Sequence, residues 1–306
     1  MTATAGLIGG IVWSMKALGS LEQQRVDENT IEMLLESSST RHAKNSTTNT
    51  PTKNRSSSLN TIHNSIISSP PLGEPNNPIL RVALLSQSPP RQVDLTGQAS
   101  CINSNGNIIQ EYNLQKIITR RHSNLVTCHS GQSGTVVVNQ RPYSETIYFL
   151  NRGAGWIVIN QLSLENYVAS VVGAEMPSHW NREALKAQAV AARSYALVHL
   201  VRPADSDFNL GDTTRWQVYA GLKSRNASTS AATKATKGLV LSFKGGLVES
   251  LYASTSQIAA EAHSHLGASM SQHGAQELAM KGLKFNEILD HYYIGSSLAR
   301  LKANGL

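Results

Sequence analysis

Glu175 is the residue of this chain whose type and surroundings best suit acid–base chemistry. It lies in the segment Gly173-Ala-Glu-Met-Pro-Ser178, in an otherwise apolar stretch. Because proline at position 177 restricts the backbone of Met176 to extended conformations, we expect a fixed bend here. A carboxyl group held in a partly apolar bend has a raised pKa, which a general acid near neutral pH requires. The alternative is an ordinary surface or helix-capping glutamate.

Polar side chains on the following segment form a second candidate group. Lys186, Gln188, Arg193 and Tyr195 interrupt a run rich in alanine. Lys186 and Arg193 are seven residues apart, so they share one face of a helix and could meet anionic groups. Such residues could hydrogen-bond a polymer, or they could simply form a solvated helix face.

A third candidate group lies in residues 265–275, where small residues surround Ser271, Gln272 and His273. This pattern predicts a loop that enters a helix and presents polar groups, although Ser271 could equally be only the helix N-cap. His263, His265 and His273 do not follow HExxH or a comparable spacing, so we predict no metal site and no cofactor. The chain also lacks the GxSxG elbow of a serine nucleophile.

The elements that must position these residues fall into two parts. Short β-type runs with turns between them predict a β-rich part, with strands at 79–85, 134–138, 146–150 and 156–159. From residue 162 onward, helical patterns alternate with a hairpin signal at 238–252. The predicted helices are 164–172, 182–200 with Asn181 as N-cap, 275–281 and 285–293. The predicted fold class is α+β: a β-rich region of residues 78–160 followed by a mixed α/β catalytic part, residues 161–306.

Composition and charge limit the class of partner. The 306 residues are 40% hydrophobic and 15% charged, with a formal net charge of +7. This balance favours polyanions, but no nucleic-acid-reading signature is present, so we predict no nucleic-acid partner. Two cysteines, Cys101 and Cys128, could form one disulfide in an oxidising compartment or remain two separate buried thiols.

The first residues suggest export or tethering. Residues 1–19 contain an apolar run too short for a comfortable membrane span, similar to the core of an export signal without its positive start. Residues 20–77 are dominated by Ser, Thr, Asn and Pro, which predicts a disordered linker. We therefore expect an extracytoplasmic location, in the periplasm or cell wall, with a possible N-terminal membrane tether.

Several segments occur together in the order of one family. The set resembles the stage II sporulation protein D (SpoIID/LytB) family of peptidoglycan enzymes and amidase enhancers, over about residues 79–301. The segments are Leu164-Glu-Asn-Tyr-Val168, Glu175-Met-Pro177, Ala184-Leu-Lys-Ala-Gln-Ala-Val-Ala-Ala-Arg-Ser-Tyr-Ala196, Gln217-Val-Tyr219, Thr236-Lys-Gly-Leu-Val-Leu241, Leu251-Tyr-Ala-Ser-Thr255, Met270-Ser-Gln-His-Gly-Ala275 and Ile288-Leu-Asp-His-Tyr-Tyr293.

The resemblance implies a lytic transglycosylase that cleaves peptidoglycan glycan strands already stripped of stem peptides, with Glu175 as the acid/base. Glu175 would protonate the glycosidic oxygen and then assist attack by the 6-hydroxyl of muramic acid, leaving a 1,6-anhydro end. Because the substrate supplies the nucleophile, a second carboxylate is not required. Asp212 is the nearest candidate for one if the outcome is hydrolysis.

The residues expected to hold the glycan are Lys186, Gln188, Arg193, Gln217, Tyr219, Ser271 and Gln272. The implied partners are peptidoglycan glycan strands and an N-acetylmuramoyl-alanine amidase. The alternative function is a non-catalytic glycan-binding protein that enhances such an amidase.

The sequence departs from the family pattern in three places. Cysteines that hold a structural zinc in some members are absent, and Gly211 and Trp216 stand near their expected positions. The stretch between Tyr252 and Met270 is shorter than usual, so a wall of the site is expected to be trimmed. The family histidine is displaced by one position, to His265, which puts its role in doubt.

Overall fold

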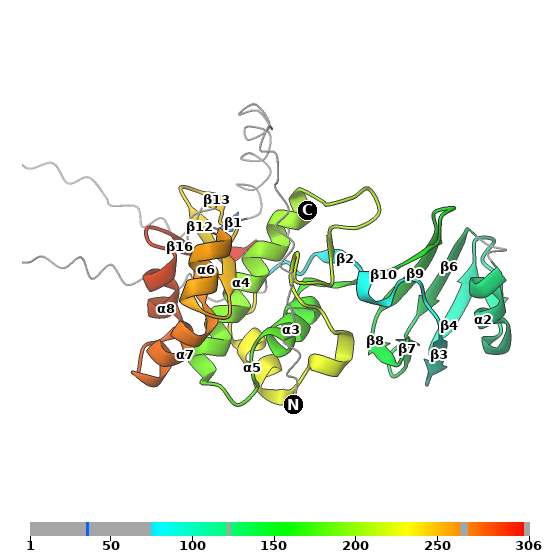
Figure 1. Ribbon diagram of the computed structural model, residues 1–306, viewed down its shortest axis with the longest axis horizontal. Helices are drawn as coiled ribbons and strands as arrows, with labels where there is room; N and C mark the ends of the chain where they lie inside the picture. The colour runs from blue at the N-terminus through cyan, green and yellow to red at the C-terminus, as the bar shows by residue number, and fades with distance from the viewer. Residues whose placement is uncertain (1–34, 37–74, 121–123, 264–268, 303–306) are drawn as a thin grey trace, which may run out of the picture.

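The structure is a computed structural model that describes residues 35–36, 75–120, 124–263 and 269–302. The predicted apolar segment 1–19 and most of the predicted linker 20–77 lie outside the described residues. Among the described residues, no helix is both long and apolar enough to span a membrane. Helices and strands are both abundant, so the α+β prediction is confirmed (Figure 1).

The largest sheet runs through both predicted parts of the chain. Among the described strands, seven form this sheet in the order β11-β2-β10-β9-β6-β4-β5. Neighbouring strands are antiparallel, except that β11 runs parallel to β2. Their bounds are β2 Ile79–Ala83, β4 Ser100–Asn103, β5 Ile108–Ile109, β6 Leu125–His129, β9 Thr146–Asn151, β10 Trp156–Ser163 and β11 Leu210–Gly211.

This sheet gives no boundary at residue 160. Strand β10 crosses the predicted division between residues 160 and 161, and β11 comes from deep inside the predicted catalytic part. Buried and less buried residues alternate along β6 and β9, as expected for strands with one face in the core. The two predicted parts therefore share one sheet.

The β-rich part carries a second sheet and one helix that the sequence did not predict. Strands β3 Val93–Thr96, β7 Thr135–Val138 and β8 Arg141–Tyr143 pair in the order β3-β7-β8. Helix α2 Glu111–Arg120 lies at the far end of the molecule, where it covers the strands around β4 (Figure 1). Its buried Leu114 and Ile118 are four residues apart, a helical spacing that the β-type reading of this region overlooked.

The two cysteines form a disulfide bond between strands. Cys101 on β4 and Cys128 on β6 are directly opposite partners in the sheet and are fully buried. Of the two alternatives that the sequence left open, the structure has the disulfide.

The helical part is built around α4. Helix α3 Leu164–Glu175 and helix α4 Arg182–Val201 agree closely with their predicted ranges, and α5 Ala227–Ala235 packs against both. The side chain of Asn181 accepts a hydrogen bond from the backbone N–H of Glu183 at 2.9 Å, so the predicted N-cap is confirmed. Nearly every residue of α4 from Ala184 to Val198 is buried, because its alanines let other elements approach on several faces. Within the described part of the chain, the short 3-10 helices η1 Leu85–Gln87 and η2 Gly221–Ser224 flank the sheet and α3.

The C-terminal elements close the side of α4 away from the β-rich part (Figure 1). Strands β1 Leu35–Glu36, β16 Ser297–Leu301, β12 Leu239–Phe243 and β13 Gly246–Leu247 form an antiparallel sheet in that order. Strands β14 Leu251–Ala253 and β15 Ser269–Ser271 pair in parallel. The helices here are α6 Ser256–His263, α7 Gln272–Met280 and α8 Phe285–Tyr292.

Two expectations for this region need correction. The predicted second hairpin strand stops at Leu247, because the chain turns away and Leu251–Ala253 pairs with β15 instead. Leu35–Glu36, inside the predicted linker, pairs with Leu301 and Arg300 of β16. Asn76 and Asn77 are also hydrogen-bonded, to Lys302 and Glu165 respectively, so regular contacts begin before the predicted start at residue 78. Polar composition did not reveal these contacts because they use backbone and amide groups.

Candidate active site around Glu175

Glu175 is the last residue of α3, at a bend of the predicted kind. The backbone of Met176 is extended (φ −128°, ψ 141°), as a residue before proline should be. The N–H of Met176 still donates to Val172 O at 3.0 Å, which ties the bend to the last helical turn. The side chain of Glu175 is half-buried. Helix end and proline together therefore place a carboxylate at a defined position.

Both carboxylate oxygens of Glu175 have a hydrogen-bond donor. The backbone N–H of Val218 donates to Oε1 at 2.8 Å, and Gln272 Nε2 lies 3.4 Å from Oε2. Burial raises the pKa of Glu175, and the two hydrogen bonds only partly oppose that rise. The carboxyl group is thus held in place while its protonated form is favoured, as a general acid requires.

A buried network around Gln217 supports this arrangement. Gln217 is fully buried, accepts from Tyr167 Oη at 3.0 Å and donates to Tyr252 Oη at 2.9 Å and Ala192 O at 3.2 Å. These three bonds fix the segment that carries the Val218 N–H. Gln217 thus acts on Glu175 through its neighbour in the chain.

Tyr252 belongs beside Glu175, and sequence reasoning did not select it. Burial, followed by the negative charge of Glu175, raises the pKa of the Tyr252 phenol well above its ordinary value. Its motif, Leu251-Tyr-Ala-Ser-Thr255, contributed to the resemblance, but nothing in the spacing linked it to residue 175. The pairing of β14 with β15 is what brings Tyr252 and the Ser271–Gln272 segment together.

Ser271 and Gln272 stand at the junction of β15 and α7. Ser271 Oγ accepts from the N–H of Gly274 at 3.0 Å, so the N-cap role that the sequence allowed is present. Both side chains are buried, and Gln272 points its amide at Glu175. Of the predicted glycan-holding residues, Gln272 is thus a direct neighbour of the candidate acid.

Lys186 and Gln188 lie in the first half of α4. Lys186 Nζ is 2.7 Å from Glu183 Oε1 and 5.6 Å from the ring centre of Phe285. Gln188 is fully buried, and neither of its amide atoms has a hydrogen-bond partner within the described part of the chain. A buried amide without partners is costly, so a polar ligand or water at Gln188 is expected.

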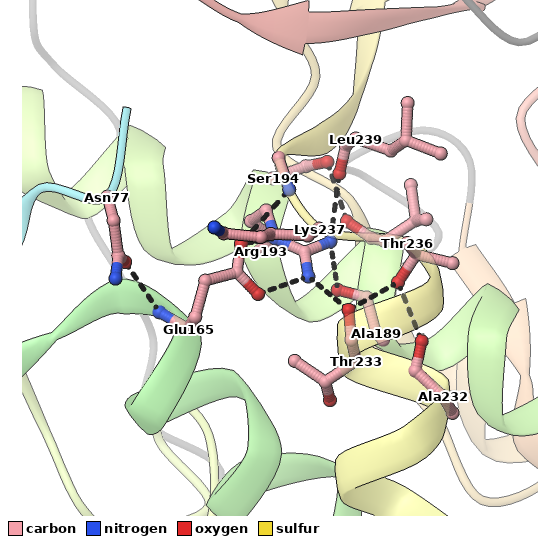
Figure 2. Close-up of polar contacts among 12 residues, drawn as sticks. Asn77, Glu165, Ala189, Arg193, Ser194, Ala232, Thr233, Thr236, Lys237 and Leu239 are labelled. Atoms are coloured by element: carbon pink, nitrogen blue, oxygen red, sulfur yellow. Dashed lines mark hydrogen bonds and ion pairs between the residues drawn. The ribbon is translucent and has the colours of Figure 1, made fainter. Parts of the chain in front are cut away.

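Arg193 has an internal role instead of the ligand contact expected from sequence. It is fully buried and forms a two-bond ion pair with Glu165, at 2.8 Å from Nε to Oε1 and 2.8 Å from Nη2 to Oε2. Its guanidinium also donates to the carbonyl oxygens of Ala189 and Leu239, and Figure 2 shows it enclosed by these groups. The seven-residue spacing places Lys186 and Arg193 on the same side of α4. Arg193 is fully buried there, whereas Lys186 is partly exposed.

Tyr219 and Asp212 are also held by the protein interior. The buried Tyr219 donates to Asn160 Oδ1 at 2.6 Å and stacks on Tyr167 at 5.3 Å between ring centres. The buried Asp212 accepts hydrogen bonds from the backbone N–H and the hydroxyl of Ser86, and Arg141 lies 4.0 Å away. Asp212 therefore ties the helical part to the chain after β2.

The position of the expected cysteines is occupied by an aromatic contact. A Cβ added to Gly211 would lie 2.4 Å from the ring of Trp216, so the indole packs directly on this glycine. Of the histidines considered for zinc, His265 is outside the described residues, and the side chain of His263 is too. The His273 ring packs against Trp180 at 4.9 Å between centres, and its backbone N–H donates to Ser254 O.

Known proteins resemble a part of this chain that includes Glu175. Residues 152–243 match the family described as SpoIID, stage II sporulation protein. An uncharacterised protein of Brachyspira hyodysenteriae is 36% identical over 38% of this chain and 32% of its own length.

Two relatives from Bacillus subtilis have descriptive names. The amidase enhancer is 42% identical over 28% of this chain and 11% of its own length. Stage II sporulation protein D is 33% identical over 43% of this chain and 41% of its own length. The chain thus spans less than half the length of each of these curated relatives. The SpoIID segment and these relatives confirm the resemblance to the stage II sporulation protein D (SpoIID/LytB) family that the sequence motifs predicted.

Proposed function

We propose that this protein cleaves peptidoglycan glycan strands by a lytic transglycosylase reaction in which Glu175 is the acid/base. The observation that carries the proposal is the half-buried carboxyl group of Glu175, with a pKa raised by burial and both oxygens held by donors. A single carboxyl group at a fixed bend suits a reaction in which the substrate provides its own nucleophile.

In the proposed reaction, protonated Glu175 gives its proton to the glycosidic oxygen as the bond to muramic acid C1 breaks. The resulting carboxylate then takes the proton of the 6-hydroxyl of the same sugar as its oxygen bonds to C1. Glu175 ends protonated, and the products are a free 4-hydroxyl and a 1,6-anhydro sugar. No water is consumed, so the balance requires no second acid.

The neighbouring residues divide into contacts and supports. Gln272 offers an amide to a sugar, and Lys186 offers a cation to a muramic acid carboxylate. Gln217 positions the Val218 N–H that holds Glu175. Ser271 positions Gln272 as the N-cap of α7.

The proposal includes a place and a partner. A glycan substrate requires a location outside the cytoplasmic membrane, with segment 1–19 as export signal or anchor and 20–77 as a linker. Residues 78–306 would act as the SpoIID/LytB-like unit. A cell-wall amidase that removes stem peptides is the partner expected before this step.

A non-catalytic role is the second candidate, and the 42% identity to a protein named amidase enhancer favours it. In that case the same surface would bind glycan and stimulate an amidase, without cleaving the strand itself. Glu175 would then matter for binding alone.

The deciding experiment uses the full chain, denuded glycan strands and mass spectrometry of the products. Wild type should release fragments with 1,6-anhydro ends, which are one water lighter than hydrolytic products. Glu175→Gln should reduce that release by at least ~100-fold, the scale of lost general acid catalysis. The matched control is Glu277→Gln, an exposed carboxylate on α7, which should behave like wild type.

Two results would overturn the proposal. If wild type binds the strands and stimulates an amidase but releases no fragment, the enhancer role is established. If Glu175→Gln cleaves as fast as the control variant, Glu175 takes no part in the chemistry.

A further inference from the structure

A basic pocket lies between α3 and α5, away from the surroundings of Glu175. It has a volume of about 310 Å³. One wall is formed by α5 and the residues just after it. This wall contributes Ser230, Thr233, Lys234 and Lys237, whose spacing of three and four residues places them on one face of the helix. The rest comes from Arg225 and from Glu165, Asn166 and Ala169 on α3.

The pocket is separate from the candidate active site. Glu165 and Glu175 are ten positions apart on helix α3, which corresponds to about 15 Å along the axis. Asn166 is nine residues before Glu175, two and a half turns, and so lies on the opposite side of the helix. A ligand in this pocket would therefore not share the acid/base.

Positive charge dominates the lining. Arg225, Lys234 and Lys237 contribute three cationic groups, and Glu165 is the acidic residue that lines the pocket. The negative charge of Glu165 is already compensated, because both of its oxygens pair with Arg193 and Oε1 also accepts from the N–H of Gly238. Figure 2 shows the Glu165 carboxylate turned toward the Arg193 guanidinium.

Two polar atoms in this lining are buried and lack partners. Arg225 Nε and Thr233 Oγ1 have no hydrogen-bond partner among the described residues. Thr233 is only 3% exposed, and its side chain points away from Arg193 in Figure 2, while its carbonyl oxygen accepts from that residue at 3.4 Å. An unpaired buried donor costs free energy comparable to a lost hydrogen bond, so both atoms fit a bound acceptor.

Arg225 is held in place without a carboxylate partner among the residues that the structure describes. Its Nη2 donates to the carbonyl oxygen of Asn166 at 2.7 Å, which leaves Nε for another acceptor. The charge of Glu145 acts on the Arg225 guanidinium, but the Glu145 oxygens already accept from Ser163 and from the Asn166 side chain. Burial lowers the pKa of Arg225, as expected for a guanidinium that has lost water and gained no counterion.

We propose that this pocket binds a phosphate group, held by Arg225, Lys234 and the Thr233 hydroxyl. Phosphate presents several strong acceptor oxygens, and guanidinium, ammonium and hydroxyl donors are its usual partners in proteins. A volume of 310 Å³ exceeds that of the free ion, so the group can arrive as an ester on a larger molecule. The site does not depend on the activity proposed for Glu175.

The test is a calorimetric titration of the full chain at constant ionic strength. One arm uses inorganic phosphate, a second uses glycerol phosphate, and a third uses acetate. We expect saturable binding of both phosphates and weaker binding of acetate. Tighter binding of the ester than of the free ion would identify the ligand as a phosphate ester; the reverse order would identify the free ion.

Three variants separate the pocket from general electrostatics. Lys234→Gln and Thr233→Val should each weaken phosphate binding by roughly fivefold or more, since each removes one donor. Thr233→Val keeps charge and shape, so its effect cannot come from net charge. Lys281→Gln, an exposed lysine after α7 that does not line this pocket, is the control and should bind as wild type does.

The proposal fails if wild type shows no saturable heat with either phosphate. It also fails if Lys234→Gln and Thr233→Val bind phosphate as tightly as the control, or if acetate binds equally well. Thermal unfolding of each variant checks that lost binding is not lost folding. Lys234 is exposed, so its variant is expected to fold normally.

Discussion

At the scale of single residues, the candidate acid and its supports differ in how far the sequence could identify them. Glu175 is recognisable because an apolar stretch and a proline surround it, and both features predict a fixed and partly buried carboxyl group. Tyr252 and the Val218 N–H are not recognisable, since they reach Glu175 only through strand pairing and loop packing. The ligand contact predicted for Arg193 does not agree with its full burial. Helix periodicity shows which residues share a face of the helix, but it does not show how deeply that face is buried.

The raised pKa of Glu175 predicts a pH-dependent cost to stability. An acid whose pKa is higher in the folded state is harder to ionise there, so stability falls as pH rises from the ordinary glutamate pKa through the raised one. We therefore expect Glu175→Gln to unfold at a higher temperature than wild type at neutral pH.

The same comparison at acidic pH supplies the control. Below the ordinary range of a glutamate both states carry the proton, so the advantage of Glu175→Gln should vanish. Thermal denaturation at the two pH values measures this difference. A stabilisation of equal size at both would show that burial of charge is not its cause.

At the scale of elements, close backbone approach explains how α3 aims its last residue. A Cβ added to Gly173 would lie 2.0 Å from the carbonyl oxygen of Ser224, in η2. The hydroxyl of Ser224 also donates to Ser170 O at 2.8 Å, so helix and 3-10 turn are locked together two residues before Glu175. The sequence predicted the helix and its end, but it could not show that Gly173 is required by a neighbour 51 residues away.

Gly173→Ala tests this contact. Because the neighbouring atom is backbone and cannot swing aside, we expect a loss of about 1–3 kcal/mol in the free energy of unfolding. Glu175 should shift with the end of the helix, so the proposed glycan cleavage should fall as well. Gly155→Ala is the matched control, since an added Cβ there meets nothing within 4 Å. Equal unfolding midpoints in denaturant for the two variants would contradict the close contact.

At the scale of the whole molecule, the shared sheet leads us to expect that the two predicted parts fold as one unit. Strand β11 pairs with β2, and both carboxylate oxygens of the buried Asp212, which follows β11, accept hydrogen bonds from Ser86. Alternation within strands was visible in the sequence, whereas pairing between residues about 130 positions apart was not. Because strand pairing over this distance is not visible in a sequence, the predicted division at residue 160 reflects only the change from β-type to helical local pattern.

A fragment of residues 161–306 tests the single unit. Without β2 and Ser86, Asp212 would be a buried carboxylate that has lost its donors, a large penalty. We expect this fragment to be insoluble or to unfold without a cooperative transition, while 75–306 unfolds cooperatively by circular dichroism. A soluble 161–306 fragment with a sharp transition would refute the shared unit.

The contact between the Trp216 indole and Gly211 determines which solution conditions affect the stability of the segment after β11. Near the positions where the family resemblance implies zinc-binding cysteines in some members, this chain has an aromatic ring in contact with a glycine. The stability that a structural metal site gives depends on the metal concentration and on the protonation of the metal ligands. An apolar contact responds instead to temperature and to chaotropic solutes, and it weakens on cooling. In this chain, folding of the segment after β11 should therefore be indifferent to chelators.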